Sequence, residues 1–369
     1  MLKIAWSPVY KYELPEGHRF PMLKYELIPE QLLYEGTVTE ANFFHPDPLP
    51  EAVALRTHTQ EYWDKLTRVT LSDREVRAIG FPINEKFVER GRHIANGTIQ
   101  CARFALEHGC ALNVAGGTHH AFADRGEGFC CFNDQAVAAN YLLDHGLAHR
   151  ILIVDLDVHQ GNGTAAIFRD EPRVFTFSMH GERNYPLRKE QSDLDLGLPD
   201  GTGDAAYLRL LRDTLPRLAD DFQPDFIFYQ SGVDVLASDK LGRLDLSREG
   251  CRERDRIVLS YARQHRIPVA VSMGGGYSPR IADIVEAHAN TFRVAMEVFG
   301  LTSSSFMVCG SPVRCALHTK RCGPGPAAHR HRPIAIGGPR RCAGGTAVAY
   351  RLPTWPHPAP PDPTWSCPR

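Results

Sequence analysis

A continuous apolar run, followed by three polar residues at every second position, constrains this chain more than any other feature. The run is ILIV at residues 151–154, and none of its side chains is suited to face solvent. Such a run predicts a strand buried on both faces, as in a parallel sheet. Asp155, Asp157 and His159 follow, and in an extended chain they lie on one side of the strand end. Two carboxylates and an imidazole are costly to desolvate there, so a divalent metal is the expected partner.

Four further apolar runs have the same character, and longer amphipathic stretches separate them. Strands separated by helices require crossover connections, which predicts an α/β fold with a mostly parallel central sheet and helices on both faces. Asn133 or Asp134 is expected to cap one helix, and Ser278 followed by Pro279 signals the start of the last one. The predicted strands are 111–115, 151–154, 174–177, 226–229 and 269–272, and the predicted helices are 84–108, 134–145, 204–221, 247–265 and 279–299.

Composition divides the chain near residue 300. Residues 1–300 carry 33 basic and 42 acidic side chains, a net charge of −9, and are expected to form a single domain. Residues 301–369 contain 12 prolines, five cysteines, nine basic residues and a single acidic residue. This segment should resist regular structure and is interpreted as a disordered extension. A basic partner-binding arm and translation outside the native reading frame remain open as alternatives.

Targeting signals and some classes of site are missing from the sequence. No run of 18 apolar residues is present, so no membrane span is expected. The N-terminus lacks the apolar core and cleavage site of a signal peptide, which favours a cytoplasmic location. The five cysteines of residues 1–300 show no CxxC spacing, which excludes zinc ribbons and thioredoxin-like sites. No direct binding of nucleic acid by residues 1–300 is expected, and the oligomeric state is left open.

Reactive residues follow four of the predicted strands, whose carboxyl ends should meet at the ligand-binding edge of the sheet. Asp157, His159 and Asp234 offer two carboxylates and one imidazole to a metal ion. Three protein ligands leave an open position for water, which is the pattern of a catalytic zinc, and iron(II) suits the same set. Asp239 and Asp245 are interpreted as loop or capping residues.

The remaining polar residues at this edge have the types needed for hydrolysis. His119 and His120 can serve as base and acid. Asp155 can orient one of these imidazoles, and Asn162 can hold the other. Tyr277 follows a run of three glycines and offers an O–H donor to a developing oxyanion. Together these groups indicate hydrolysis of an amide or ester carbonyl.

Two other functions fit parts of the same segment. The pair Asp155 and Asp157 before Gly-Thr resembles the DxDGT motif of haloacid-dehalogenase-like phosphatases, which would bind magnesium. However, five residues, VHQGN, separate the second aspartate from that Gly-Thr pair. Gly161, Gly163 and Ala166 match a GxGxxA dinucleotide fingerprint, but an acidic segment separates them from the strand. Both patterns are weaker matches than the hydrolytic set.

Five motifs of the chain resemble, in order, those of the zinc-dependent histone deacetylase superfamily. They are GGTHHA, GFCCFND, DLDVHQGNGT, SGVDVLASDKLG and MGGGYS, and the match extends over residues 1 to about 300. This superfamily includes acetoin-utilisation proteins and acetylpolyamine amidohydrolases. The segments GHRFPMLKY, NYP and GLPDGTGD look closest to its bacterial and class IV-like branch. The resemblance implies an arginase-like three-layer fold and a catalytic domain over residues 1–300 that removes acetyl groups from acetyl-lysine-type amides.

The resemblance also implies roles for individual residues. The family's zinc ligands, tandem histidines and oxyanion-stabilising tyrosine fall on the residues assigned above from their chemistry. Phe129 and Tyr185 would line a narrow tube for the methylene chain of the substrate, and Gly117 and Gly275 would flank it.

A structural potassium site and two departures from the family pattern complete the comparison. One departure is that the chain has no secure equivalent of the rim aspartate that grips a peptide backbone in some relatives, which weakens the case for a histone or protein substrate. The other departure is at residue 162. Asn162 stands where many relatives have an aspartate, and a neutral partner should leave His120 less readily protonated. The implied potassium ligands are Asp155, Ser178, Met179 and the main-chain oxygens of Asp157 and His159.

The leading hypothesis is therefore a zinc-dependent amidohydrolase that deacetylates lysine or a related amine. An acetylpolyamine or other small-molecule amidohydrolase is the nearest alternative. A non-catalytic protein that binds acyl-lysine or a metabolite in the same pocket is an alternative of another class. The intact ligand set and Tyr277 favour catalysis.

Overall fold

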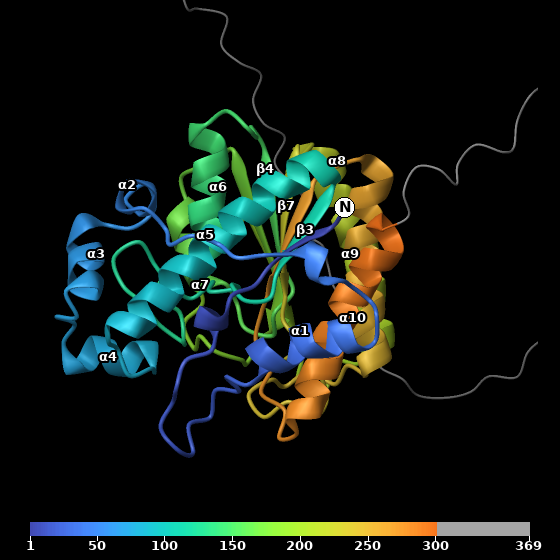
Figure 1. Ribbon diagram of the computed structural model, residues 1–369. Helices are drawn as coiled ribbons and strands as arrows, with labels where there is room; N and C mark the ends of the chain where they lie inside the picture. The colour runs from blue at the N-terminus through green and yellow to red at the C-terminus, as the bar shows by residue number, and fades with distance from the viewer. Residues whose placement is uncertain (301–369) are drawn as a thin grey trace, which may run out of the picture. The chain divides into compact units, whose positions relative to one another are not determined.

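A parallel β-sheet forms the centre of the computed structural model, which describes residues 1–300 (Figure 1). Its eight strands follow the order β2-β1-β3-β8-β7-β4-β5-β6, and all paired strands are parallel. The predictions for residues 301–369, and the proposed boundary at 300, concern a segment outside the described residues and stay predictions. The strands are β1 (Lys3–Ala5), β2 (Phe43–Phe44), β3 (Cys110–Asn113), β4 (Ile151–Asp155), β5 (Val174–Gly181), β6 (Leu194–Leu198), β7 (Phe226–Ser231) and β8 (Val269–Met273).

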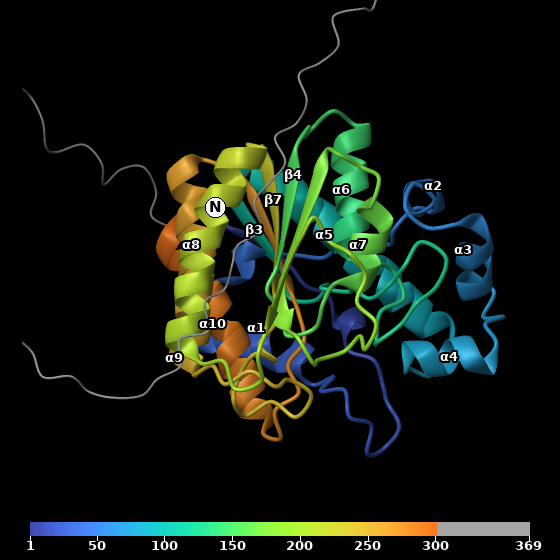
Figure 2. The ribbon, with the colours of Figure 1, turned by 180° about the vertical axis from the view of Figure 1, so that it is seen from behind.

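Helices cover both faces of this sheet. In Figure 1 the helices α5, α6 and α7 lie on one side of the strands and α8, α9 and α10 lie on the other, and Figure 2 shows the same layers from behind. Helix α1 packs against α10, and α2, α3 and α4 lie outside α5 and α6. The helices are α1 (Lys24–Tyr34), α2 (Glu51–Ala54), α3 (Gln60–Thr67), α4 (Asp73–Ile79), α5 (Glu85–His108), α6 (Asp134–Asp144), α7 (Asn162–Phe168), α8 (Asp204–Phe222), α9 (Arg248–His265) and α10 (Ile281–Phe299).

The predicted three-layer α/β fold is confirmed. Every residue of β3, β4, β5, β7 and β8 is buried, as expected of strands covered on both faces. Asn133 caps α6 as predicted, because its side chain accepts the N–H of Ala136. The predicted start of α10 is wrong: the helix begins at Ile281, and the Ser278 hydroxyl bonds to Ser238 at 2.8 Å instead of capping it.

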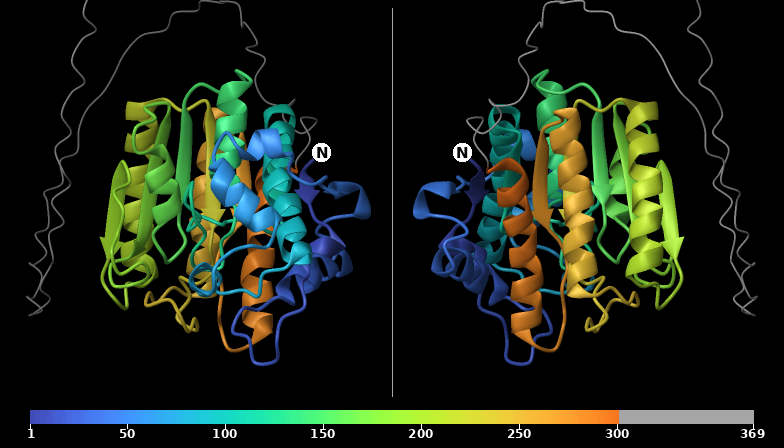
Figure 3. Two further views of the ribbon diagram at one scale, coloured as in Figure 1. Left: turned by 90° about the vertical axis from the view of Figure 1, so that its left-hand side faces the viewer. Right: turned by 90° about the vertical axis from the view of Figure 1, so that its right-hand side faces the viewer.

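The parallel arrangement places the carboxyl ends of all strands at one edge. Figure 3 shows the strand arrows pointing the same way, with long loops leaving that edge. The loops that follow β3, β4, β7 and β8 carry the residues singled out from the sequence, and these four strands are neighbours in the sheet. Within residues 1–300, no helix is both long and apolar enough to cross a membrane. The cytoplasmic location stays a prediction.

A buried histidine holds together the loops that lead into this edge. His58 is 2% exposed, its Nδ1–H donates to the carbonyl of Phe122 at 3.0 Å, and its Nε2 accepts the Asn133 N–H at 3.1 Å. The neutral ring satisfies both contacts, whereas a protonated ring would present a hydrogen to the Asn133 N–H. Burial lowers the pKa of His58 to about 4.

This histidine should make the protein sensitive to acid. An unfolded histidine titrates near 6.5, so its contribution is complete above that pH and is lost as the pH falls from 6.5 towards 4. The full loss is about 3 kcal/mol of unfolding free energy. Urea unfolding at several pH values should show that the free energy of unfolding falls less steeply in acid for His58→Gln than for the native protein. Replacement of the exposed His145 by glutamine is the control; equal slopes for His58→Gln and the native protein would contradict the assignment.

Candidate active site

Three of the predicted residues form a compact buried cluster. Asp157 and His159 lie in the loop after β4, and Asp234 lies in the loop after the neighbouring strand β7. Their candidate ligand atoms are all within 4.8 Å of one another. Nδ1 of His159 is 3.1 Å from Oδ1 of Asp157 and 3.1 Å from Oδ2 of Asp234. The fold therefore brings together the three residues that the sequence predicts as metal ligands.

The charges of this cluster fit a divalent cation. Burial and the charge of Asp157 raise the pKa of Asp234 to about 7. Burial alone would lower the pKa of His159, but its hydrogen bonds to Asp157 and Asp234 raise that pKa to about 10. Two carboxylates forced together away from water need a positive partner, and a set of two oxygens and one nitrogen suits zinc or iron(II).

Backbone groups and one buried arginine hold the two ligand loops. Oδ2 of Asp157 accepts the Gly275 N–H at 2.7 Å, and Oδ1 of Asp234 accepts the Val158 N–H at 3.0 Å. Arg254, on α9, donates to the carbonyls of Leu156 and Gly232, one in each loop. Its charge is paired with the adjacent buried Asp255. The candidate ligand side chains are thus fixed by contacts that connect both loops, which limits their rearrangement.

The tandem histidines have different partners. Nδ1 of His119 is 2.7 Å from Oδ2 of Asp155, and Nδ1 of His120 is 2.6 Å from Oδ1 of Asn162. Burial would lower the pKa of His119, but the Asp155 carboxylate raises it above its usual value. Burial and the neighbouring His119 and His159 hold the pKa of His120 well below its usual value. In both rings Nε2 is the nitrogen left for a ligand.

Tyr277 approaches the same cavity from the loop after β8. Asp239 accepts the Tyr277 N–H at 2.5 Å as well as the N–H groups of Leu241 and Gly242. This aspartate, interpreted from the sequence as a loop or capping residue, therefore also places the tyrosine. Within residues 1–300 the Tyr277 hydroxyl has no hydrogen-bond partner. Burial, with the charges of Asp234 and Asp157, raises the pKa of Tyr277 well above its usual value, so the hydroxyl is a donor at neutral pH.

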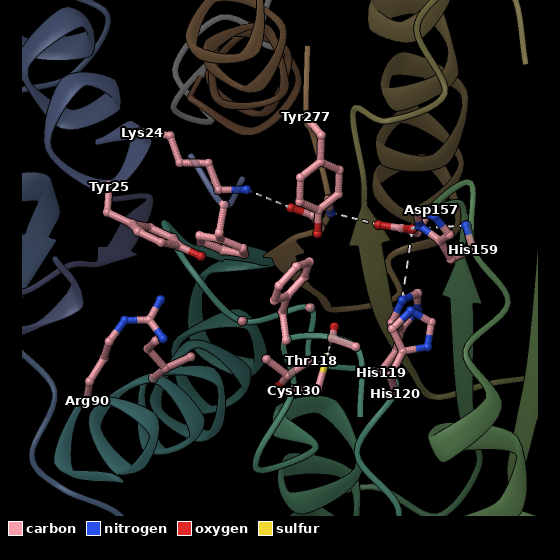
Figure 4. Close-up of a pocket in the computed structure, with 18 residues that line it drawn as sticks. Lys24, Tyr25, Arg90, Thr118, His119, His120, Cys130, Asp157, His159 and Tyr277 are labelled. Atoms are coloured by element: carbon pink, nitrogen blue, oxygen red, sulfur yellow. Dashed lines mark hydrogen bonds and ion pairs between the residues drawn. The ribbon is translucent and has the colours of Figure 1, made fainter. Parts of the chain in front are cut away.

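One cavity connects these groups (Figure 4). Both histidines, Asp157, His159 and Tyr277 line it, and so do the predicted channel residues Gly117, Phe129 and Gly275. A Cβ atom on Gly117 would lie 2.2 Å from the carbonyl oxygen of Met273, so the narrow wall leaves no room for a side chain there. Tyr185 does not line this inner cavity but a wider outer pocket that shares Phe129, His120 and Tyr277 with it.

The residues of the implied potassium site lie together in the sheet. Asp155 at the end of β4 pairs in register with Ser178 of β5, and the buried Met179 follows. Both carboxylate oxygens of Asp155 have partners, because Oδ1 accepts the Asp157 N–H at 3.1 Å and Oδ2 bonds to His119. The Ser178 hydroxyl bonds to Nδ1 of His180 at 2.9 Å. The potassium site stays a prediction.

The sequence did not predict the cationic side of the cavity. Figure 4 shows Lys24, Tyr25 and Arg90 gathered on the side opposite Asp157 and His159. Nζ of Lys24 donates to the carbonyl of Gly274 at 3.1 Å, and burial lowers the pKa of this lysine to about 8. Lys24 and Tyr25 belong to the segment GHRFPMLKY. The resemblance of this segment to the family is the only sequence feature that could have pointed to their place in the site.

Comparisons with known proteins identify the family of this chain. The model of the histone deacetylase domain matches residues 18–292. An uncharacterised protein of Picosynechococcus sp. is 45% identical, covering 80% of this chain and 99% of its own length. Histone deacetylase 2 of Arabidopsis thaliana is 31% identical, covering 73% of this chain and 72% of its own length.

Solved structures show the same fold. A crystal structure of an HDAC homologue from Aquifex aeolicus has a TM-score of 0.69 and 27% identity, covering 81% of this chain and 84% of that one. A crystal structure of an HDAC homologue complexed with SAHA has a TM-score of 0.68 at the same identity and coverage. The domain match extends over most of the chain and includes the whole metal cluster, the tandem histidines and the tyrosine. This chain therefore belongs to the histone deacetylase family.

Proposed function

We propose that this protein is a metal-dependent deacetylase that hydrolyses the N-acetyl amide of acetyl-lysine or a related acylated amine. One observation carries the proposal: Asp157 and His159 of the buried three-residue cluster line one cavity together with two further histidines and Tyr277. Family membership and the likeness to an HDAC homologue complexed with SAHA support the same chemistry.

Asp157, His159 and Asp234 would hold the metal ion, for which we propose zinc with iron(II) as the alternative. When bound, such an ion supplies a water molecule of lowered pKa and polarises the amide carbonyl. The Gly275 N–H and the Val158 N–H keep the two carboxylates oriented for this role.

The other residues bind the acyl group and move protons. Because Asp155 and Asn162 occupy the Nδ1 atoms of the tandem histidines, Nε2 of His119 and of His120 are the atoms that accept a proton from water and return one to the leaving amine. The Tyr277 hydroxyl donates to the oxygen of the carbonyl as negative charge develops on it. Phe129, together with the glycine wall at Gly117, excludes water from the methylene chain of the substrate.

The test is turnover by the purified full chain after loading with zinc or with iron(II). We expect acetate release from an acetyl-lysine peptide, loss of activity with a chelator and recovery when the metal returns. Longer acyl-lysine peptides and acetylated polyamines in the same assay identify the preferred acyl group and amine. Binding of acetyl-lysine by the metal-loaded protein without release of acetate from any substrate would contradict the proposal and favour a binding protein.

A further inference from the structure

The outer pocket, which shares His120, His159 and Tyr277 with the inner cavity, is lined by three arginines. They are Arg19, Arg183 and Arg243, and no carboxylate of residues 1–300 is among the residues that line this pocket. The loop before α1 and the loops after β5 and β7 carry them, and these loops lie at the lower end of the ribbon in Figure 1. Three guanidinium groups from three separate segments thus surround one opening.

The positive charge of this opening is only partly neutralised. Arg19 lies over the ring of Phe129, 5.0 Å from its centre, and forms no ion pair with an acidic residue of the described chain. Arg183 and Arg243 share a single carboxylate, that of Asp200, at 3.9 Å and 3.3 Å. Their side chains are 75% and 56% exposed, so both remain open to a ligand.

The acidic side chain that bonds to Tyr185 of this pocket, Glu127, is already engaged. Oε1 of Glu127 accepts from Arg125 at 2.9 Å, and Oε2 accepts the Tyr185 hydroxyl at 2.8 Å. Tyr185 in turn packs edge-on against His120, with 4.9 Å between ring centres. Glu127 therefore fixes the rim, and its charge is balanced by Arg125 and not by the three arginines of the opening.

This local charge is opposite to that of the surrounding protein. Residues 1–300 carry a net charge of −9 from 33 basic and 42 acidic side chains. A cationic opening on an acidic body attracts anionic groups and repels cationic ones. Arginine also matches carboxylate geometry, because its N–H groups form two parallel hydrogen bonds to one carboxylate.

On the basis of the proposed function, we propose that this opening selects acylated amines that carry a carboxylate close to the acylated chain. Acidic residues beside an acetyl-lysine in a peptide, or the α-carboxylate of free Nε-acetyl-lysine, supply that group. Basic peptides and acetylated polyamines would place their cations against the arginines. The same active site would then act poorly on them.

Two sets of matched substrates test this selection with the metal-loaded full chain. The first set is three peptides with acetyl-lysine flanked on both sides by Glu, Gln or Arg. We expect kcat/KM to fall in that order, by roughly tenfold from first to last, the size expected of a few exposed charge pairs. Near 1 M salt, where the screening length is about 3 Å, the difference should nearly vanish. The second set compares Nε-acetyl-lysine with N-acetylcadaverine, which lacks only the carboxylate, and we expect preference for the first.

A variant with reversed charge at the opening tests the role of the arginines. Arg19→Glu combined with Arg183→Glu should reverse the ratio of kcat/KM between the Glu and Arg peptides. The ratio is measured within one protein sample, so losses in folding or in metal loading cancel. Arg150→Glu is the matched control, because its guanidinium also lies over a phenylalanine ring, 5.1 Å from the centre of Phe222, but it precedes β4 at the other edge of the sheet. The control should keep the native ratio.

The outcomes separate this inference from the proposed function. A preference for the Glu peptide would mean that the recognised carboxylate belongs to side chains that flank the acetyl-lysine. A preference only for Nε-acetyl-lysine over N-acetylcadaverine would mean that it is the α-carboxylate of the free amino acid. Turnover of all substrates without either preference, or a preference for Arg peptides, would overturn the inference and leave deacetylation standing. Absence of turnover with every substrate would overturn both.

Discussion

Replacing Asp157 by asparagine should remove the bound metal and lower kcat/KM by about 10³-fold or more. The substitution keeps the size of the side chain but removes a charge from a buried set of three candidate ligands. The metal provides several kcal/mol of transition-state stabilisation in hydrolases of this kind, and each 1.36 kcal/mol corresponds to tenfold in rate. Elemental analysis and peptide turnover measure the two effects.

The same variant should also lose the stabilisation that comes from metal binding. A ligand that binds only the folded state raises the melting temperature, so added zinc should raise the Tm of the native protein and leave that of Asp157→Asn nearly unchanged. Asp225→Asn is a suitable control, since Asp225 lies just before β7, at the opposite edge of the sheet. Full metal content and near-native turnover in Asp157→Asn would show that the ligand assignment is wrong.

Long and central strands were the part of the fold that sequence predicted well. The apolar runs within β4, β7 and β8 are buried on both faces, so no polar alternation obscures them. Strands β1 and β2 have three and two residues, too few for any periodicity to appear. Strand β6 is the outermost strand on one side of the sheet and is partly exposed, and its sequence LDLGL carries a charge and a glycine.

The residues of the candidate site could be grouped from the sequence where they directly follow such strands. Asp157, His159 and Asp234 could be grouped because parallel strands end at one edge, whatever the distance between them in the sequence. Contacts between segments that are far apart in the sequence could not be predicted in this way. Lys24 reaches a carbonyl 250 residues away, and Arg254 on α9 reaches one 98 residues away.

The prediction for the start of α10 was wrong for a related reason. Ser278 followed by Pro279 has the local pattern of a helix start, but the Ser278 hydroxyl bonds across to the loop after β7. A local capping preference contributes about 1 kcal/mol, which a tertiary contact can match. This displacement matters for the site, because Tyr277 directly precedes the serine.

Replacing Tyr277 by phenylalanine should lower kcat by about 10²- to 10³-fold and leave metal binding intact. The change removes one oxygen, and the loss of a single donor to an oxyanion has an effect of this size. The ring keeps its contacts with Phe20 and Phe129, whose centres lie 6.2 Å and 6.0 Å away, and the backbone N–H keeps its bond to Asp239. No hydrogen bond to the described residues is lost, so the Tm should stay close to the native value.

Separate measurements of kcat, of KM and of metal content distinguish this role from a structural one. A residue that only shaped the cavity would change KM or metal content, whereas a donor used in the transition state lowers kcat and kcat/KM together. Tyr25→Phe is the matched comparison, because Tyr25 lines the same cavity on the side of Lys24 and Arg90, away from the metal cluster (Figure 4). Its kcat should stay within a few-fold of the native value. If Tyr277→Phe retained more than about one tenth of the native kcat, the oxyanion would have to be stabilised mainly by other groups.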